Sequence, residues 1–330
     1  MIMRQILNEL FQNNTLSRTD SKDILIKIAN GEYNISQMAA FLTVFQLRNV
    51  TLDELQGFRD AMLEMCISVD FSDHNTVDLC GTGGDNKDTF NISTLASFVV
   101  AGAGEKVVKH GNYGVSSVCG SSNVLEYFGY TFSNNQDKLK KELEETGICF
   151  LHAPKFNPAM KNIAPIRKEL GVKTFFNMLG PMVSPASPKN QLIGVFNLEL
   201  GRIYNYIYQN LDRNYSIVHS LDGYDEISLT GDFRIQSKKE DTINSPDDFG
   251  FKKVDPLEIT GGSSIKKSAE IFLSILKGEG TTAQNNVVVA NAGLAIHCIY
   301  PAKSITECIE LAKSSLLGGK ALASFKNIMN

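Results

Sequence analysis

The sequence has no excess of basic residues, no long apolar stretch and no closely paired cysteines. Its 330 residues include 32 Lys and Arg against 36 Asp and Glu, which gives a formal net charge of −4 at pH 7. Proteins that bind a phosphate backbone usually carry a basic surface, so nucleic acid is not the expected partner. Any anionic ligand must instead be held by local chemistry.

Apolar runs end well before the roughly 18 residues that a membrane-spanning helix needs. The first residues, Met-Ile-Met-Arg-Gln, do not have the pattern of a signal peptide. The cysteines are scattered without a C-x-x-C pair, which argues against a zinc cluster and against a disulfide framework. We therefore expect a soluble cytoplasmic protein with reduced thiols and no membrane partner. The cysteines are Cys66, Cys80, Cys119, Cys149, Cys298 and Cys308.

The composition is that of an ordinary globular protein, and the length suits two domains. Residues 1–72 read as helices only. Thr51 and Glu54 have the spacing of a capping box, and apolar residues recur behind them every three or four positions. Residues 36–47 give a second amphipathic helix. We therefore expect a small all-helical N-terminal domain over residues 1–72.

From Thr76 onward, strand-like and helix-like patterns alternate, which predicts an α/β domain over residues 73–330 with a central, largely parallel sheet flanked by helices. The residues between 241 and 253 read as a surface loop. The expected strands are 76–80, 105–109, 148–151, 192–196, 215–219, 226–230 and 233–236. The expected helices are 121–128, 137–146, 265–276, 282–298 and 305–317.

A glycine-rich segment, Asp78-Leu-Cys-Gly-Thr-Gly-Gly-Asp85, follows the first of these strands, and Asn91-Ile-Ser-Thr94 begins a helix. Glycines allow the backbone N–H groups to turn toward an anion, and a helix N-terminus favours phosphate. Asn86 stands where a P-loop or a dinucleotide fingerprint needs glycine, so neither motif fits. The alternative is a plain glycine turn capped by Ser93.

A second donor-rich segment, Lys109-His-Gly-Asn-Tyr-Gly-Val-Ser-Ser117, also leaves a strand and leads to a helix near Ser121. Its lysine, amide and hydroxyl groups suit phosphate oxygens. A histidine by itself is more often structural than catalytic, but this context favours a site role for His110.

Two further segments carry charge. Asp225 and Glu226 follow a glycine turn, and paired carboxylates suit magnesium, although such a pair is usually only a solvated turn. Arg167, on an expected helix, can grip a carboxylate in bidentate fashion, although a solvated surface arginine is the simpler reading.

Together these motifs, in this order and spacing, resemble the anthranilate phosphoribosyltransferases. The resemblance covers nearly the whole chain, including the 157–181 segment. It implies a transferase of tryptophan biosynthesis that uses Mg²⁺ and joins anthranilate to 5-phosphoribosyl 1-pyrophosphate. It also implies that a helical segment near residues 165–185 completes the N-terminal domain, that the larger domain binds the phosphoribosyl group, and that the helical domains form a homodimer.

The resemblance also implies roles for individual residues. The pyrophosphate would be held by Gly81, Gly84, Asp85, Thr89, Asn91, Ile92, Ser93 and Thr94. The phosphoribosyl site would be completed by Lys109, His110, Gly111, Asn112, Tyr113, Gly114, Val115, Ser116, Ser117 and Ser121. Magnesium would be bound by Ser93, Asp225 and Glu226. Gly81, Asn112 and Arg167 match positions that contact anthranilate, with His110 beside it, and we expect His110, Asn112 and Arg167 to be the catalytic residues.

The chain departs from the family pattern at two positions, because Tyr113 stands where arginine is common and Asn157 where histidine is common. Three alternatives remain open. One is a pyrimidine-nucleoside phosphorylase, which shares the fold but uses inorganic phosphate. The second is a non-catalytic relative that binds nucleic acid, and the third is a phosphoribosyltransferase for another aromatic amine.

Overall fold

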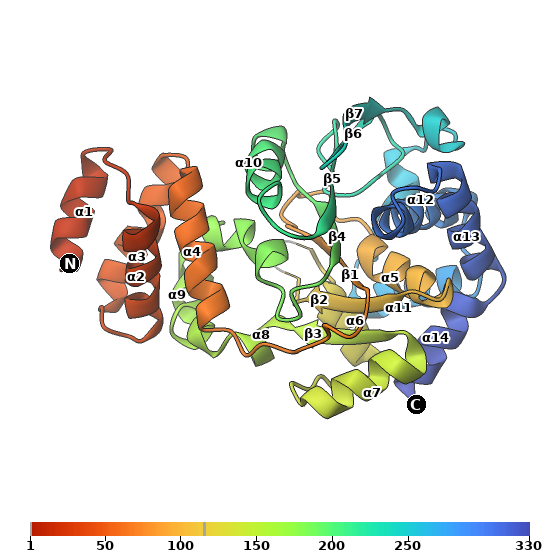
Figure 1. Cartoon of the computed structure of the whole chain (residues 1–330), viewed down its shortest axis with the longest axis horizontal. Helices are drawn as coiled ribbons and strands as arrows, with labels where there is room; N and C mark the ends of the chain where they lie inside the picture. Colours follow the sequence, from red (N-terminus) through yellow and green to blue (C-terminus); the bar gives the residue numbers. More distant parts are fainter. Residues whose placement is uncertain (1, 115–116) are drawn as a thin grey trace. The chain divides into compact units, whose positions relative to one another are not determined.

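The computed structural model describes residues 2–114 and 117–330, so the expected site residues Val115 and Ser116 lie outside the described part. The chain divides into two compact units. The helical unit comprises Met1–Ser68 and Ala153–Pro185, and the sheet unit comprises Val69–His152 and Ala186–Asn330. Figure 1 colours the chain from the N-terminus to the C-terminus.

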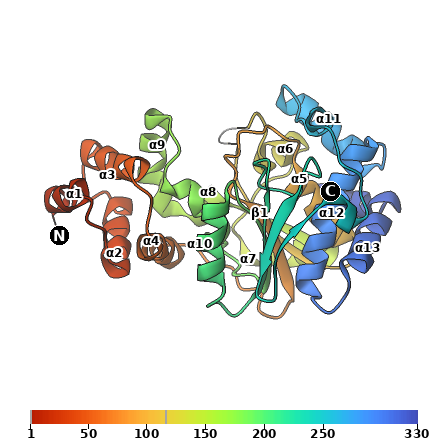
Figure 2. The same ribbon diagram turned by 90° about the horizontal axis from the view of Figure 1, so that it is seen from above.

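The helical unit is built from two separate stretches of sequence. Thr51 and Glu54 form the expected capping box at the start of α4. Phe58 on α4 stacks on Phe175 from the later stretch, with ring centroids 4.1 Å apart, so the later stretch supplies part of the core. Figure 2 shows α9 beside α3. The elements are α1 (Met3–Phe11), α2 (Arg18–Ala29), α3 (Ile35–Leu47), α4 (Leu52–Glu64), α8 (Ala153–Phe156) and α9 (Ala164–Leu170), with 3-10 turns at Pro158–Asn162, Phe175–Met178 and Gly180–Val183.

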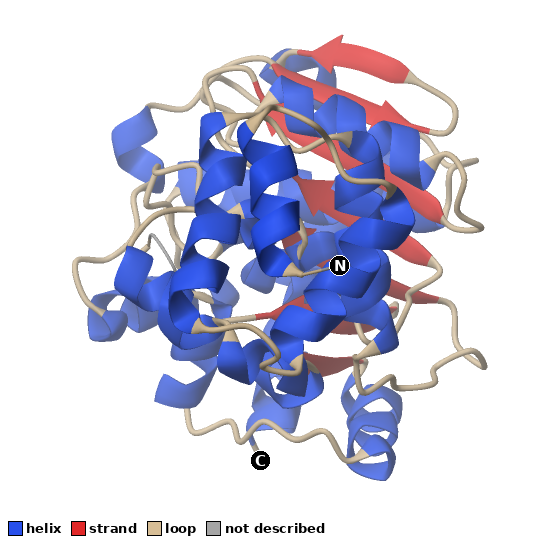
Figure 3. Cartoon of the chain, turned by 90° about the vertical axis from the view of Figure 1, so that its left-hand side faces the viewer, coloured by secondary structure: helices blue, strands red, loops and turns tan. Residues whose placement is uncertain are grey.

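The sheet unit contains one seven-stranded sheet in the order β3-β2-β1-β4-β5-β6-β7. The first five strands in this order are parallel, and β6 and β7 are antiparallel additions at one edge. Figure 3 shows the strands side by side in red. The bounds are β1 (Thr76–Gly81), β2 (Lys106–Gly111), β3 (Ile148–His152), β4 (Asn190–Gly194), β5 (Asn214–Ser220), β6 (Phe233–Ser237) and β7 (Asp241–Asn244).

Helices cover both faces of this sheet, so its central strands are buried on both sides. Figures 1 and 2 agree that α10 lies on one face while α5 and α12 lie on the other. Every residue of β3 and β4 is buried. The bounds are α5 (Ile92–Gly102), α6 (Ser121–Tyr127), α7 (Gln136–Thr146), α10 (Leu198–Tyr208), α11 (Ile265–Leu276), α12 (Thr282–Ile299), α13 (Ile305–Leu317) and α14 (Lys320–Met329), with 3-10 turns at Pro246–Phe249 and Pro256–Ile259.

Two segments differ from what their sequences predict. Residues 226–230 are not a strand: Leu229 adopts a left-handed φ of 58°, which interrupts an extended conformation. The stretch from 241 to 253 is not only loop, because Asp241–Asn244 forms the edge strand β7. The residues of β7 are half-buried or exposed because the strand lies at the edge of the sheet. Its sequence therefore lacks the apolar pattern of a buried strand and resembles that of a polar loop. The strand expected at 192–196 begins two residues earlier, at Asn190.

Among the residues that the structure describes, no helix is both long and apolar enough to cross a membrane.

Candidate active site

The candidate site lies at the carboxyl ends of the parallel strands, where ligands bind in open α/β sheets. The segment that carries Asp225 packs directly against the ends of β1 and β4. A Cβ added to Gly81 would lie 2.5 Å from Oδ2 of Asp225, and a Cβ at Gly194 would overlap the Asp225 carbonyl oxygen. Glycine at these two positions therefore allows the acidic segment to approach the sheet.

The first loop, residues 82–91, has the geometry of an anion cradle. Gly83, Gly84, Asn86 and Asp88 all have positive φ values, which turn successive peptide groups within a short space. The loop ends at the N-terminus of α5, whose first N–H groups have no partner within the helix. The Asn91 side chain does not cap this helix end, so the end is suited to an anionic ligand.

Instead of capping α5, Asn91 joins the first loop to the second. Its Nδ2 donates a hydrogen bond of 2.8 Å to the carbonyl oxygen of Cys119. A second link runs from the Val118 N–H to Oδ1 of Asp88, at 3.4 Å. The two donor-rich loops that the sequence singled out therefore lie together.

The second loop is held at its base by Asn112 and Asn123. The Asn112 carbonyl accepts hydrogen bonds from the Ser122 N–H and the Ser121 hydroxyl, both at 3.1 Å. Oδ1 of Asn123 accepts from the N–H groups of Gly114 and Gly120, both at 3.0 Å. The Asn112 side chain accepts from the next residue's N–H at 2.8 Å.

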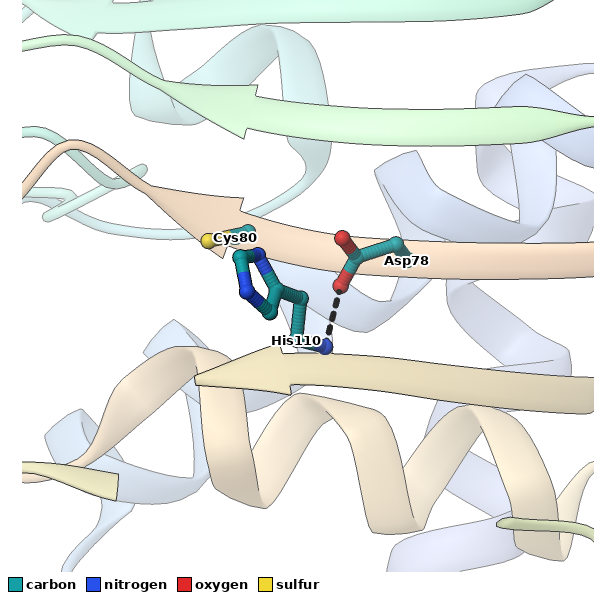
Figure 4. Close-up of side chains that lie close together, drawn as sticks. All are labelled: Asp78, Cys80 and His110. Atoms are coloured by element: carbon teal, nitrogen blue, oxygen red, sulfur yellow. Dashed lines mark hydrogen bonds between the residues drawn. The ribbon is translucent and has the colours of Figure 1, made fainter. Parts of the chain in front are cut away.

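Asp78, Cys80 and His110 lie together on β1 and β2, and their ligand-type atoms are all within 4.8 Å of one another (Figure 4). Oδ1 of Asp78 accepts a hydrogen bond of 3.0 Å from the backbone N–H of His110. Burial raises the pKa of Asp78 to about 6 and that of Cys80 to about 12. The thiol is therefore protonated at neutral pH.

Lys109 is 3% exposed, and its ammonium donates to the carbonyl oxygens of Leu79 and His110. Its charge also opposes the rise in pKa of Asp78 and Glu226. In this structure Lys109 offsets buried negative charge beneath the loops.

The acidic pair, Asp225 and Glu226, has strongly raised pKa values. Burial, followed by the charge of Asp85, raises the pKa of Asp225 to about 7. Burial and the Asp225 charge raise the pKa of Glu226 well above its usual range, against Lys109 and a hydrogen bond with Ser93. Crowded, desolvated carboxylates beside a hydroxyl form a set of hard oxygen donors, which fits magnesium.

The remaining expected residues of the first loop differ in what they offer. The side chains of Ile92 and Thr94 are buried, at 1% exposure each, so Ile92 can contribute only backbone groups. Thr89 forms an isolated β-bridge with Thr260. Gly111 ends β2 beside Ser121, and Ser117 is half-buried in the second loop.

Both departures from the family pattern have local partners. The Tyr113 hydroxyl donates a hydrogen bond of 2.7 Å to Oε1 of Glu126, and its ring lies 4.7 Å from the His152 ring. Asn157, which is buried, donates to the Ala153 carbonyl at 3.2 Å.

Arg167 belongs to the helical unit, whereas the other expected site residues belong to the sheet unit. Its Nη2 donates to Oδ1 of Asn177 at 3.2 Å, and its guanidinium lies 5.1 Å from the centroid of the Phe176 ring. Burial lowers the pKa of this arginine.

Two side chains that hold the acidic segment, Ser220 and Asn291, were not among the residues predicted from the sequence. Ser220 Oγ donates to the Glu226 carbonyl at 2.6 Å, and the Asn291 amide bonds both backbone groups of Ile227. The available signal was the single amide within the apolar stretch of residues 287–296, where a buried polar group needs partners.

Comparisons with known proteins agree with this architecture. Residues 4–66 match the helical bundle domain of the glycosyl transferase family, and residues 73–322 match its a/b domain. An anthranilate phosphoribosyltransferase of Flavobacterium psychrophilum is 60% identical over 326 residues, which cover 99% of this chain and 98% of that protein.

Two solved structures extend the similarity to the fold. The anthranilate phosphoribosyltransferase of Thermus thermophilus superposes with a TM-score of 0.90 at 30% identity and covers 98% of both chains. That of Saccharomyces cerevisiae, in complex with PRPP and Mg, also has a TM-score of 0.90, at 25% identity, and covers 99% of this chain and 96% of that one. The sequence motifs, the fold and these similarities all agree: the chain belongs to the anthranilate phosphoribosyltransferase family.

Proposed function

We propose that this enzyme transfers the phosphoribosyl group of 5-phosphoribosyl 1-pyrophosphate to the amine of anthranilate, giving N-(5-phosphoribosyl)anthranilate and pyrophosphate in tryptophan biosynthesis. The observation that carries the proposal is the joining of two donor-rich loops at the ends of parallel strands, beside the buried Asp225 and the half-buried Glu226. The family assignment supports the same reaction.

In this proposal, the pyrophosphate lies against the N–H groups of the first loop and the N-terminus of α5. Gly81, Gly84 and Asp85 line this part of the site, and Asn91 to Thr94 complete it. The ribose phosphate contacts the second loop, from Lys109 to Ser117 and Ser121. Local N–H dipoles serve this purpose because the net charge of the chain, −4, offers no general attraction for an anion.

Ser93, Asp225 and Glu226 would hold magnesium. When bound, Mg²⁺ neutralises the negative charge that grows on the leaving pyrophosphate. A bound cation would also offset the mutual repulsion of Asp225 and Glu226, which explains why carboxylates with such raised pKa values are kept in the site.

Breaking the bond at the anomeric carbon places positive charge on the sugar and negative charge on the leaving group. The N–H groups of the first loop stabilise the negative charge where it develops, which is commonly the largest catalytic contribution. The aryl amine of anthranilate is neutral at pH 7, so the reaction needs no strong general base. Positioning that amine against the ribose carbon supplies the rest, and no covalent intermediate with the enzyme is required.

For the acceptor, we propose that Arg167 binds the anthranilate carboxylate and that Asn112 and Gly81 also contact anthranilate, with His110 beside it. Arg167 is already held by Asn177 and Phe176, which limits the freedom that its side chain loses on binding. We also propose that the enzyme works as a homodimer formed through its helical units, and that it acts in the cytoplasm. The free cysteines agree with a reducing compartment.

The rival with a shared fold is a pyrimidine-nucleoside phosphorylase. It is distinguished by incubating the purified protein with either 5-phosphoribosyl 1-pyrophosphate and anthranilate or uridine and inorganic phosphate. The proposal predicts release of pyrophosphate in the first mixture and no release of uracil in the second. Uracil release without pyrophosphate release would reject it. A gel shift at physiological salt tests the nucleic-acid-binding alternative.

A further inference from the structure

Asn291 is a fully buried amide that contacts the segment of the acidic pair. It lies on α12 with 0% exposure, between the buried apolar residues Ala290 and Ala292. Its Oδ1 accepts a hydrogen bond of 3.0 Å from the Ile227 N–H, and its Nδ2 donates to the Ile227 carbonyl at 2.9 Å. A second bond from Nδ2, to the Val287 carbonyl at 2.8 Å, fixes the amide on its own helix.

Asn291 thus gives Ile227 both hydrogen bonds that a neighbouring strand would give it in a sheet. Residues 226–230 form no strand, and Ile227 itself is 0% exposed. A buried backbone group without a partner costs about 1–3 kcal/mol, so this segment depends on side chains for its bonding.

Ser220, at the end of β5, completes the arrangement. Its hydroxyl donates to the Glu226 carbonyl at 2.6 Å and accepts from the Ser228 N–H at 3.2 Å. Four successive backbone groups, from the Glu226 carbonyl to the Ser228 N–H, are therefore held by just two side chains. The same segment is fixed on its other side, where Gly83 donates to Asp225.

We propose that Asn291 is a positioning residue that holds the backbone of Glu226 and Ile227, and through it the carboxylates of Asp225 and Glu226 that would bind magnesium. Asn291 lines the same small hollow as Ser93 and Glu226, but its amide is engaged by backbone groups. It therefore acts through the acidic pair rather than on substrate. This inference rests on the proposed function, which assigns magnesium to that pair.

The test measures equilibrium binding of 5-phosphoribosyl 1-pyrophosphate by calorimetry across a magnesium titration, using the full-length enzyme. Asn291→Leu keeps a branched side chain of similar shape but removes all three hydrogen bonds. We expect the magnesium concentration for half-maximal binding to rise about 10- to 100-fold, the usual effect of losing a residue that orients metal ligands.

Val288→Ala is the matched control. Val288 is also buried on α12 at 0% exposure, and its truncation costs stability but removes none of the hydrogen bonds between Asn291 and Ile227. It should lower Tm while leaving the magnesium dependence unchanged. If Asn291→Leu does not fold, Ser220→Ala serves as the second variant, because it removes the other anchor and should shift the magnesium dependence in the same direction.

A folded Asn291→Leu or Ser220→Ala enzyme with wild-type magnesium dependence overturns the positioning role. The Asp225→Asn, Glu226→Gln double variant separates this result from failure of the proposed function. If the double variant loses magnesium-dependent binding while both positioning variants keep it, only the positioning role is wrong. If the double variant also binds like wild type, the metal assignment itself is wrong.

Discussion

The backbone N–H of Gly83 donates a hydrogen bond of 2.7 Å to Oδ2 of Asp225, a residue 142 positions later in the chain. This bond joins the proposed pyrophosphate loop directly to the proposed metal site. A change in the charge of Asp225 must therefore affect both the loop and the stability of the protein.

The first prediction concerns the stability of the metal-free enzyme. The pKa of Asp225 is raised from 3.8 to about 7, so the folded state favours the neutral acid. This contribution to stability is fully present below pH 3.8 and is lost as the pH rises through 7. Asp225→Asn should therefore be more stable than wild type in EDTA at pH 8 by a few kcal/mol, because each pH unit between the two pKa values contributes about 1.4 kcal/mol, and the advantage should shrink toward pH 5.

Thermal melts at both pH values measure this difference. Asp247→Asn is the matched control, since Asp247 is an exposed carboxylate on a surface turn. A Tm of Asp225→Asn at pH 8 no higher than that of wild type or of this control would mean that the ionised carboxylate of Asp225 does not destabilise the folded enzyme.

The second prediction is that the thiols do not take part in the reaction. Cys80 lies beside Asp78 and His110, but burial keeps its pKa at about 12. Because the thiolate is the reactive form, Cys80→Ala should leave kcat largely unaltered across neutral pH. Cys66→Ala, in the helical unit, is the control. Loss of turnover in a folded Cys80→Ala enzyme alone would contradict a purely electrostatic mechanism.

The third prediction concerns Tyr113, which replaces a common arginine of the family. Its hydroxyl bonds to Glu126, so an arginine at this position has a carboxylate with which to pair. Tyr113→Arg should therefore be tolerated and should lower the KM for 5-phosphoribosyl 1-pyrophosphate or leave it unchanged. Tyr113→Phe, which keeps the ring against His152, controls for loss of the hydroxyl. A large fall in kcat for Tyr113→Arg but not for Tyr113→Phe would show that the cation is harmful in this loop.

The fourth prediction assigns Arg167 to the acceptor. A hydrogen bond to a charged group contributes about 1.5–3 kcal/mol, so Arg167→Ala should raise the KM for anthranilate roughly 10- to 150-fold. The KM for 5-phosphoribosyl 1-pyrophosphate should change little. Arg167→Lys keeps the charge but loses the planar guanidinium, so its KM for anthranilate should lie between those of the wild type and Arg167→Ala. Michaelis curves in which both constants rise together would show that Arg167 does not distinguish the substrates.

Much of the architecture could be predicted from local patterns. The capping box at Thr51 and Glu54 and the buried strand at residues 148–151 depend on interactions between residues close in sequence, so each can be recognised within one short segment. The edge strand β7 could not be predicted, because its polar residues match a surface loop and only pairing with β6 makes it a strand.

The residues of the site could likewise be predicted only where a short segment carries the motif. Glycines, paired carboxylates and the Lys109 segment are visible as motifs, because each carries its chemistry locally. The prediction of a strand over residues 226–230 was wrong. The backbone of this segment is bonded by the side chains of Ser220 and Asn291, where a strand would be bonded by the backbone of a neighbouring strand. Asn291 lies 64 positions from Ile227, and no spacing rule connects them.

The most direct test of the proposed function is the loss of anthranilate fluorescence in the presence of the purified enzyme. With both 5-phosphoribosyl 1-pyrophosphate and magnesium present, the signal should fall while one pyrophosphate is released for each anthranilate consumed. Omitting either component, or using the Asp225→Asn, Glu226→Gln double variant, should abolish the fall. An unchanged signal with the complete mixture, or full activity of the double variant in limiting magnesium, would contradict the account.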